Sequence, residues 1–311
     1  MTVLLATRMG ADEQAQWLSL LQAALPEEHF VTTRDPATDP QIDIAVVANP
    51  PPAALRNLPN LRFIQSLWAG VETLLSDATV PAEIPLARMV DPAMNTAMAE
   101  TALWAVLSLH RGYFECAMQQ AQGQWQSVPQ PRADEVSVAV LGLGQMGRAV
   151  AMRLVQNGYR VSAWSLNAAT LEGAQTAHGE RALGQVLAAA HIVVNLLPLT
   201  AATRGILNAQ AFAAMRTGAS LINLARGAHV VDTDLLAALN SGHLKRAVLD
   251  VFQTEPLPAD HPFWTHPQVT VLPHVAAQTD PRTAVQVVVR NVISHRAGGQ
   301  IQHVVNRHAG Y

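Results

Sequence analysis

Residues 138–147 read Val-Ala-Val-Leu-Gly-Leu-Gly-Gln-Met-Gly. The apolar run that ends at Leu141 predicts a buried strand, and the pattern after Gly147 predicts a helix. The glycines between them have the spacing G-x-G-x-x-G in the order strand, turn, helix, which favours a dinucleotide-binding turn over a coincidental glycine bend. The expected contacts with the pyrophosphate come from the turn and from the free N–H groups of the helix N-terminus: Gly142, Gly144, Gln145, Met146 and Gly147.

The corner after the next predicted strand reads Trp164-Ser165-Leu166-Asn167. An acidic residue about 20 residues after the turn binds the ribose 2′-hydroxyl of NAD. Ser165 stands at that place, so no carboxylate repels a 2′-phosphate, and Ser165 and Asn167 can donate hydrogen bonds to it. No Arg or Lys follows at once. We therefore expect NADP(H) as the favoured cofactor and NAD(H) as the alternative.

Short apolar runs alternate with helical patterns along the whole chain, which predicts βαβ units and parallel sheets, and thus an α/β fold. The length of 311 residues corresponds to about two domains. Residues 94–122 read as one long helix. The expected strands are 3–6, 44–48, 63–66, 86–89, 137–141, 160–164, 192–197, 220–224, 247–251 and 269–272.

The last predicted helix is clearly bounded, because Asp280 is a natural N-cap, Pro281 fits the first helical position, and Gly298 can end the helix. A helix of this length after the last strand can return the chain to the first domain. We therefore predict a discontinuous first domain with a second domain inserted in it. The expected boundaries are residues 1–99 plus 280–311 for the substrate-binding domain, and 100–279 for the NAD(P)-binding domain.

Composition excludes several classes of protein. The net charge is −3, so basicity does not drive binding to nucleic acid or to acidic membranes. The apolar runs are far shorter than the ~20 residues of a membrane span. One cysteine, Cys116, allows no disulfide within the chain, and we expect a cytoplasmic protein. His261 and His266 follow one another in a proline-rich segment without a paired ligand motif, so we expect no metal site.

Chemistry-bearing side chains follow three of the predicted strands, where the ligands of open α/β sheets gather. Arg226 can hold a carboxylate and polarise a neighbouring carbonyl. His274 can give a proton to the carbonyl oxygen while a hydride reaches the carbon, and Glu255 can orient its ring. Asp250 can anchor a nicotinamide carboxamide. Each residue alone has an ordinary structural alternative, but their order after the glycine turn predicts hydride transfer to a 2-oxo acid.

These residues, together with residues 196–205 and the ending 306–311, resemble the signature blocks of the D-isomer-specific 2-hydroxyacid dehydrogenases. The resemblance covers essentially the whole chain, more weakly in its first third. It implies that Arg226 binds substrate, that Glu255 orients the histidine, and that His274 is the acid/base. It also extends the expected cofactor contacts to Trp164, Ser165, Leu166, Leu197, Pro198, Thr203, Ala225, Asp250 and His274.

The resemblance is strongest to the bacterial glyoxylate/hydroxypyruvate reductases of this family. It implies two Rossmann-like domains with parallel sheets, in which the cofactor domain is inserted into a flavodoxin-like substrate domain. It further implies a homodimer, formed mainly through the cofactor domain. The implied reaction is reduction of a small 2-oxo acid by NAD(P)H to the D-2-hydroxy acid.

Two departures from the family pattern stand out. Leu166 occupies a place where this branch commonly has arginine, which weakens the case for NADPH. The substrate-carboxylate loop, usually made of small residues, contains Trp68-Ala69-Gly70. The backbone of Ala69 and Gly70 can still bind a carboxylate, together with Arg226 and His274. Trp68 either walls the pocket or is a structural core residue.

Two other kinds of protein remain as alternatives. The 6-phosphogluconate and 3-hydroxyacid dehydrogenases share the glycine fingerprint, but they place it at the extreme N-terminus and use a lysine base. Transcriptional corepressors built on the dehydrogenase scaffold sense a cofactor without needing turnover. An intact set of Arg226, Glu255 and His274 favours catalysis.

Overall fold

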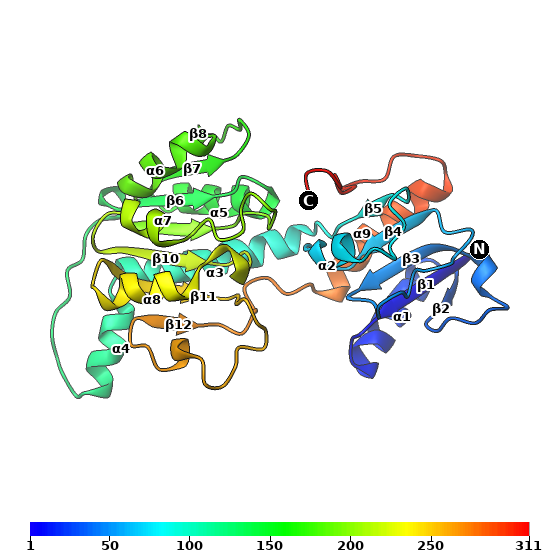
Figure 1. Ribbon diagram of the computed structural model, residues 1–311, viewed down its shortest axis with the longest axis horizontal. Helices are drawn as coiled ribbons and strands as arrows, with labels where there is room; N and C mark the ends of the chain where they lie inside the picture. Colours follow the sequence, from blue (N-terminus) through cyan, green and yellow to red (C-terminus); the bar gives the residue numbers. More distant parts are fainter. Residues whose placement is uncertain (311) are drawn as a thin grey trace. The chain divides into compact units, whose positions relative to one another are not determined.

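The computed structural model describes residues 1–310, and the chain divides into two compact units. Unit 1 is Met1–Met94 with Thr279–Tyr311, and unit 2 is Asn95–Gln278 (Figure 1). Helix α3 (Pro92–His110) crosses the first division between the units, after Met94, without a loop, and the domain boundaries expected at residues 99 and 280 stay predictions. The second division lies before Thr279.

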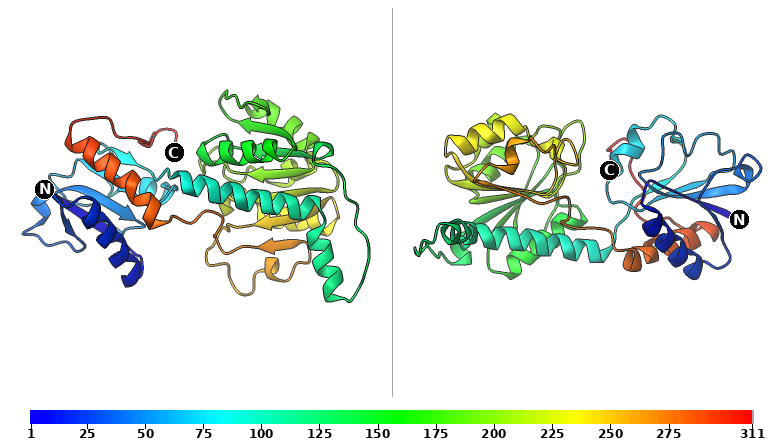
Figure 2. Two further views of the ribbon diagram at one scale, coloured as in Figure 1. Left: turned by 180° about the vertical axis from the view of Figure 1, so that it is seen from behind. Right: turned by 90° about the horizontal axis from the view of Figure 1, so that it is seen from below.

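Unit 1 is built on a parallel sheet with the strand order β2-β1-β3-β4-β5. Helices α1 and α9 lie side by side on one face of it (Figure 2, left). Asp280 caps α9 by accepting the N–H of Arg282, as the sequence predicts. The elements are β1 (Thr2–Thr7), α1 (Ala11–Ala24), β2 (His29–Val31), η1 (Asp39–Gln41), β3 (Ile42–Ala48), β4 (Phe63–Ser66), α2 (Glu72–Ser76), β5 (Leu86–Ala87) and α9 (Pro281–Arg296).

Unit 2 is built on a parallel sheet with the order β12-β11-β10-β9-β6-β7-β8. Its strands are β6 (Ser137–Leu141), β7 (Arg160–Ser165), β8 (Gln175–His178), β9 (Ile192–Asn195), β10 (Ala219–Asn223), β11 (Leu244–Leu249) and β12 (Val269–Val271). Its helices, apart from α3, are α4 (Tyr113–Ala121), α5 (Gln145–Gln156), α6 (Glu180–Ala189), α7 (Ala209–Ala214) and α8 (Asp232–Asn240), with η2 (Ala133–Glu135), η3 (Gly227–His229) and η4 (Pro262–Trp264).

Helices cover both faces of this sheet. Val138 and Val140 of β6 join a core cluster with residues of α3 and α5, whereas Ala139 and Leu141 join one with residues of α6 to α8. Figure 2 (left) shows α3 and α5 on the near side of the sheet. Because successive strand residues point to opposite faces, a strand segment buried on both sides must be apolar throughout, as residues 138–141 of β6 and 192–194 of β9 are. The predicted α/β class with two Rossmann-like parallel sheets is confirmed.

Two predicted elements were wrong in detail, and two strands were not predicted. Residues 94–122 form two helices rather than one, since α3 ends at His110 and Gly112 adopts φ 68° ahead of α4. Glycine reaches this left-handed conformation at little cost, so the chain turns there. The strand expected at 86–89 is only Leu86–Ala87, because Arg88 N–H instead bonds to His303 O of the C-terminal segment. The short strands β2 and β8 were missed.

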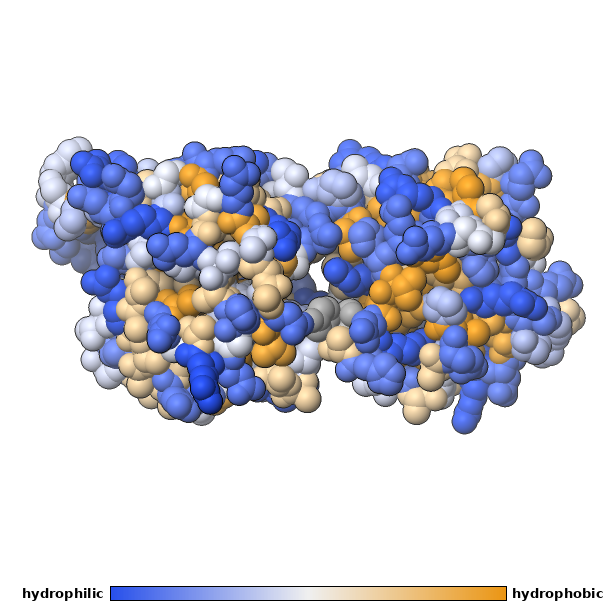
Figure 3. Space-filling view, turned by 90° about the horizontal axis from the view of Figure 1, so that it is seen from above, coloured by the Kyte–Doolittle hydropathy of each residue, from blue (hydrophilic) through white to orange (hydrophobic). Residues whose placement is uncertain are grey.

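Hydrophilic residues cover much of the face shown in Figure 3, with apolar patches between them. Among residues 1–310, no helix is long and apolar enough to cross a membrane.

Candidate active site

The glycine turn between β6 and α5 has the geometry of a phosphate cradle. Gly142 has φ 100°, and a Cβ there would lie 2.6 Å from Leu196 O. A Cβ on Gly147 would lie 1.8 Å from Gly142 O. The turn and α5 therefore come this close to each other only because residue 147 has no side chain. A Cβ on Gly144, by contrast, would meet nothing within 4 Å. The exposed space over Gly144, next to the first N–H groups of α5, fits a pyrophosphate.

The corner after β7 is closed by its own hydrogen bonds. The Ser165 hydroxyl donates to Asn167 O at 2.7 Å, and Leu166 is 46% exposed. The indole of Trp164 is buried and donates to Gly179 O at 2.9 Å. Only the main chain of Trp164 serves the turn, because its carbonyl accepts the N–H of Gly142 at 2.8 Å. The cofactor contact that the family resemblance implies for Trp164 stays a prediction.

The loop after β9, which carries Leu197, Pro198 and Thr203, is shaped by a buried hydroxyl. Thr203 Oγ1 donates to Pro198 O at 2.6 Å and accepts the N–H of Thr200 at 2.8 Å. Leu197 is buried, and its N–H faces Asn195 Oδ1 at 3.3 Å. Thr203 thus fixes the shape of this loop from inside.

A buried polar network lies beneath the sheet edge at the ends of β9 and β10. Asn195 Nδ2 donates to Asn223 Oδ1 at 2.9 Å and lies 3.0 Å from His229 Nδ1. Asn223 Nδ2 in turn donates to Arg226 O at 3.0 Å, and Asn223 Oδ1 faces the N–H of Ala225 at 3.3 Å. Asn195, Asn223 and His229 are fully buried. Sequence reasoning missed them, although a polar residue at the end of an apolar strand was a readable signal.

Arg226 follows β10 and is held close to the segment after β11. Its Nη1 donates to Ala225 O at 2.6 Å. A Cβ on the next residue, Gly227, would lie 1.9 Å from the carbonyl carbon of Phe252, so only glycine permits this approach. Gly227 therefore brings the Arg226 segment against the one that carries Glu255.

His274 and Glu255 form the pair that the sequence predicts. His274 Nδ1 lies 2.7 Å from Glu255 Oε2, and Glu255 Oε1 accepts the N–H of Phe252 at 2.8 Å. The hydrogen bond to Glu255 raises the pKa of His274, although burial and Arg226 oppose it. Burial pushes the pKa of Glu255 upward, but the hydrogen bonds from His274 and Phe252 outweigh it and lower the pKa. The raised pKa favours the protonated form of this half-exposed imidazole, which is the form that a proton donor needs.

Asp250, at the end of β11, holds the His274 segment from behind. Its carboxylate is buried and accepts the N–H groups of Val275 at 2.7 Å and Ala276 at 3.1 Å. Its carbonyl accepts the N–H of His274, which has φ 54°. Burial raises the pKa of Asp250. Both of its carboxylate oxygens already serve the main chain, and the anchoring of a carboxamide by Asp250 stays a prediction.

Trp68, Ala69 and Gly70 follow β4 in unit 1. The Ser66 hydroxyl accepts the N–H of Trp68 and donates to its carbonyl, both at 3.0 Å, and Met89 N–H bonds to the same carbonyl. Within residues 1–310, the N–H groups of Ala69 and Gly70 have no hydrogen-bond acceptor. These two partly buried donors fit the binding of an anion. Trp68 is partly buried, and its role as a pocket wall stays a prediction.

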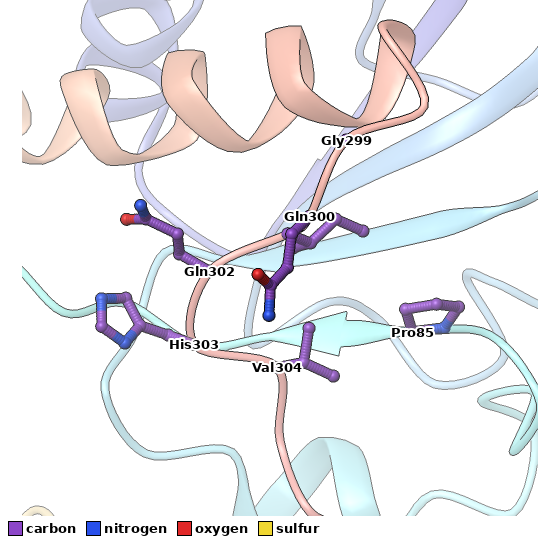
Figure 4. A pocket seen from close by; sticks show the side chains of 7 residues that line it. Pro85, Gly299, Gln300, Gln302, His303 and Val304 are labelled. Atoms are coloured by element: carbon purple, nitrogen blue, oxygen red, sulfur yellow. The ribbon is translucent and has the colours of Figure 1, made fainter.

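Two further features lie away from these residues. His261 pairs with Asp232 at 3.6 Å, and His266 lies 3.2 Å from Asn240 Oδ1. In the part of the chain described, no three His, Cys, Asp or Glu side chains are grouped as a metal ion would need. A pocket of about 790 Å³ in unit 1 is lined by Pro85 and residues 299–304 (Figure 4), and none of the predicted site residues lines it.

The known proteins that this chain resembles in sequence all point to one family of dehydrogenases. Residues 103–276 match the family described as D-isomer specific 2-hydroxyacid dehydrogenase, NAD binding domain. Glyoxylate/hydroxypyruvate reductase A of Serratia proteamaculans is 40% identical over 95% of this chain and 96% of that protein. The same enzyme of Yersinia enterocolitica is 38% identical over 96% of this chain and 97% of its own.

Solved structures that are similar to this chain belong to the same dehydrogenase family. A D-isomer specific 2-hydroxyacid dehydrogenase from Xanthobacter autotrophicus, in complex with NADPH and MES, has a TM-score of 0.94 at 37% identity, covering 100% of this chain and 99% of that one. An NADPH-dependent glyoxylate/hydroxypyruvate reductase from Sinorhizobium meliloti, in complex with NADP and sulfate, has a TM-score of 0.91 at 32% identity, again with 100% and 99% coverage.

Proposed function

The chain belongs to the D-isomer-specific 2-hydroxyacid dehydrogenase family, and we propose that it reduces small 2-oxo acids, glyoxylate and hydroxypyruvate foremost, to their 2-hydroxy acids. One observation carries this proposal. The proton-donor pair His274–Glu255 lies within electrostatic reach of Arg226, on the same sheet edge as the dinucleotide turn. Parallel strands bring their C-terminal ends to one edge, so the ends of β6, β10, β11 and β12 meet there.

The roles of the side chains follow from their charges. Arg226 binds the substrate carboxylate and polarises the 2-oxo group, and the open N–H groups of Ala69 and Gly70 are proposed as further carboxylate donors. His274 gives the proton on Nε2 to the carbonyl oxygen, which becomes the hydroxyl, while Glu255 on Nδ1 stabilises the protonated ring. The ring then regains a proton from water. The D configuration of the product is proposed from family membership.

NADP(H) is the favoured cofactor, and when bound it supplies the hydride that reaches the substrate carbon. The turn at Gly142, Gly144 and Gly147 fits its pyrophosphate, because Gly144 leaves open space and α5 begins at the next residue. The corner holds no carboxylate, in keeping with a 2′-phosphate. The remaining predicted contacts, at Leu197, Pro198, Ala225 and Asp250, belong to this proposal.

The corepressor alternative is not favoured, because the relatives over almost the whole chain are reductases. The test is consumption of NADPH and, in parallel, NADH by the purified protein with glyoxylate, hydroxypyruvate, pyruvate and phenylpyruvate. Fast turnover of glyoxylate and hydroxypyruvate is expected. Measurable cofactor binding without turnover of any acid would contradict a reductase and support a sensing protein.

A homodimer is also part of the proposal. Unit 2 exposes Trp104, Tyr113, Met118 and Trp125 on α3, on α4 and in the segment after α4, and Trp125 is 100% exposed. Such a concentration of exposed aromatic and apolar side chains is typical of an interface. Light scattering of the purified protein is expected to give twice the chain mass, and Trp104→Glu is expected to reduce it. We further propose a cytoplasmic location, since the single cysteine suits a reducing compartment.

A further inference from the structure

The corner after β7 poses an electrostatic problem for the favoured cofactor. A 2′-phosphate carries about two negative charges and calls for a cation. Leu166 offers an apolar side chain, and the proton of the Ser165 hydroxyl is already donated to Asn167 O. Hydrogen bonds from neutral groups alone leave that charge without a counter-charge. The binding of NADP(H) therefore needs a cation from another element.

We propose that Arg148, on the first turn of α5, binds the 2′-phosphate of NADP(H) in place of a cation at the corner. This inference rests on the proposed function in one respect, the use of a nicotinamide cofactor. It names the residue that selects NADP(H) over NAD(H). Arg148 follows Gly147 of the phosphate turn directly, so it begins from the element that holds the pyrophosphate.

The position of the side chain supports this role. Arg148 Nη1 donates to Thr170 O at 2.9 Å, so the guanidinium lies against the segment that continues from Leu166 and Asn167. The N–H of Gly142 bonds to Trp164 O, which places the glycine turn and the corner side by side. The guanidinium of Arg148 therefore starts from the helix that follows the glycine turn and reaches the segment that follows the corner.

The charge of Arg148 is available to a ligand. Among residues 1–310 its guanidinium forms no ion pair, and the one hydrogen bond of that group goes to a neutral carbonyl and uses a single N–H. The other N–H groups of the planar guanidinium remain for phosphate oxygens, which arginine binds in bidentate fashion. The bond to Thr170 O also restricts the side chain before the ligand arrives, so less rotamer entropy is lost on binding.

Equilibrium binding tests the inference without any substrate. Calorimetry with NADP⁺, NAD⁺, adenosine 2′,5′-bisphosphate and 5′-AMP is compared for the wild type, Arg148→Ala and Arg153→Ala. Arg153 is the matched control, an arginine in the last turn of the same helix. Arg148→Ala is expected to weaken NADP⁺ and the bisphosphate by about 10- to 100-fold, as for a lost charge-assisted hydrogen bond. NAD⁺ and 5′-AMP should change less than about twofold.

A second variant guards against misfolding. In the Arg148→Ala background, Leu166→Arg returns a cation to the corner and is expected to restore NADP⁺ affinity. Equal losses for NADP⁺ and NAD⁺ in Arg148→Ala, or no loss for NADP⁺, would overturn the inference and leave the proposed function standing. Failure of the wild type to bind either dinucleotide would overturn both.

Discussion

The two sheets have the same parallel construction but very different C-terminal edges. In unit 2, buried polar side chains connect the loops of the edge: Asp250 holds the segment of His274, and Asn223 holds that of Arg226. In unit 1, the buried network joins Asn291 of α9 to Gln65 of β4 and to Gln302 of the C-terminal segment. The segment after β4 is held mainly through Trp68, and the two N–H groups that follow are left open.

This difference indicates a division of tasks. A proton donor must be held within a fraction of an ångström and in one protonation state, so its surroundings need fixed side chains and charges. Recognition of a carboxylate by main-chain N–H groups needs only the course of the backbone. We therefore propose that the edge of unit 2 is the catalytic edge and that the edge of unit 1 is the recognition edge. Substitutions can test this comparison, beginning with the one of largest effect.

Replacement of the proton donor is expected to have the greatest consequence. His274→Ala removes the general acid and should lower kcat by about 10²–10⁴-fold. The Kd for NADPH should change far less than kcat, because the glycine turn is untouched and His274 is only one of the expected cofactor contacts. Steady-state kinetics and fluorescence titration of NADPH measure the two effects separately. Activity close to the wild type in this variant would refute the mechanism and with it the assignment of unit 2 as the catalytic edge.

Arg226 should come next. Arg226→Ala loses both the hold on the carboxylate and the polarisation of the carbonyl, so kcat/KM should fall by about 10²–10³-fold. Arg226→Lys keeps the charge but loses the planar fork, so it should recover only part of the loss. Full recovery with lysine would mean that charge alone matters at this edge. The comparison of the two variants over the same range of glyoxylate concentrations decides between these outcomes.

The pH dependence isolates the contribution of Glu255. Reduction needs protonated His274, so kcat/KM is full below the pKa of His274 and falls as the pH rises through it. Because the hydrogen bond to Glu255 is the main cause of the raised pKa, Glu255→Gln should move this falling limb to lower pH. The rate at neutral pH should fall as well. An unshifted limb in the pH profile of kcat/KM would show that Glu255 does not control the protonation of His274.

The parts of the molecule that local patterns determine were predictable. The turn at Gly142, Gly144 and Gly147 and the N-cap at Asp280 follow from the conformations of single residues, and the structure has both. The apolar strands of unit 2 follow from burial on both faces. The family assignment is confirmed by relatives over most of the chain.

The remainder depends on contacts between distant segments. Nothing in the local sequence near Asn223 or His229 shows that they meet Asn195, about 30 residues earlier. Gly112 ends α3 within a sequence that otherwise favours helix, and a glycine inside such a pattern does not by itself fix a left-handed residue. The hydrogen bond from the Ser165 hydroxyl to Asn167 O depends on the backbone course of the corner, which its own residue types do not determine.

The smallest expected effect concerns the recognition edge, where Trp68 precedes the two open N–H groups. If the main chain of Ala69 and Gly70 binds the carboxylate, Trp68→Ala should leave kcat with glyoxylate within about threefold of the wild type, far less than any change at the catalytic edge. If Trp68 walls the pocket, the same variant should raise kcat/KM for phenylpyruvate relative to glyoxylate by about tenfold, since one or two lost contacts change discrimination on that scale. Trp68→Phe is the matched control, and its ratio of kcat/KM for phenylpyruvate to that for glyoxylate should lie between the ratios of the wild type and Trp68→Ala.

A lower melting temperature of Trp68→Ala with an unchanged ratio of kcat/KM for the two substrates would instead identify Trp68 as a structural residue. The recognition edge would then consist of backbone alone.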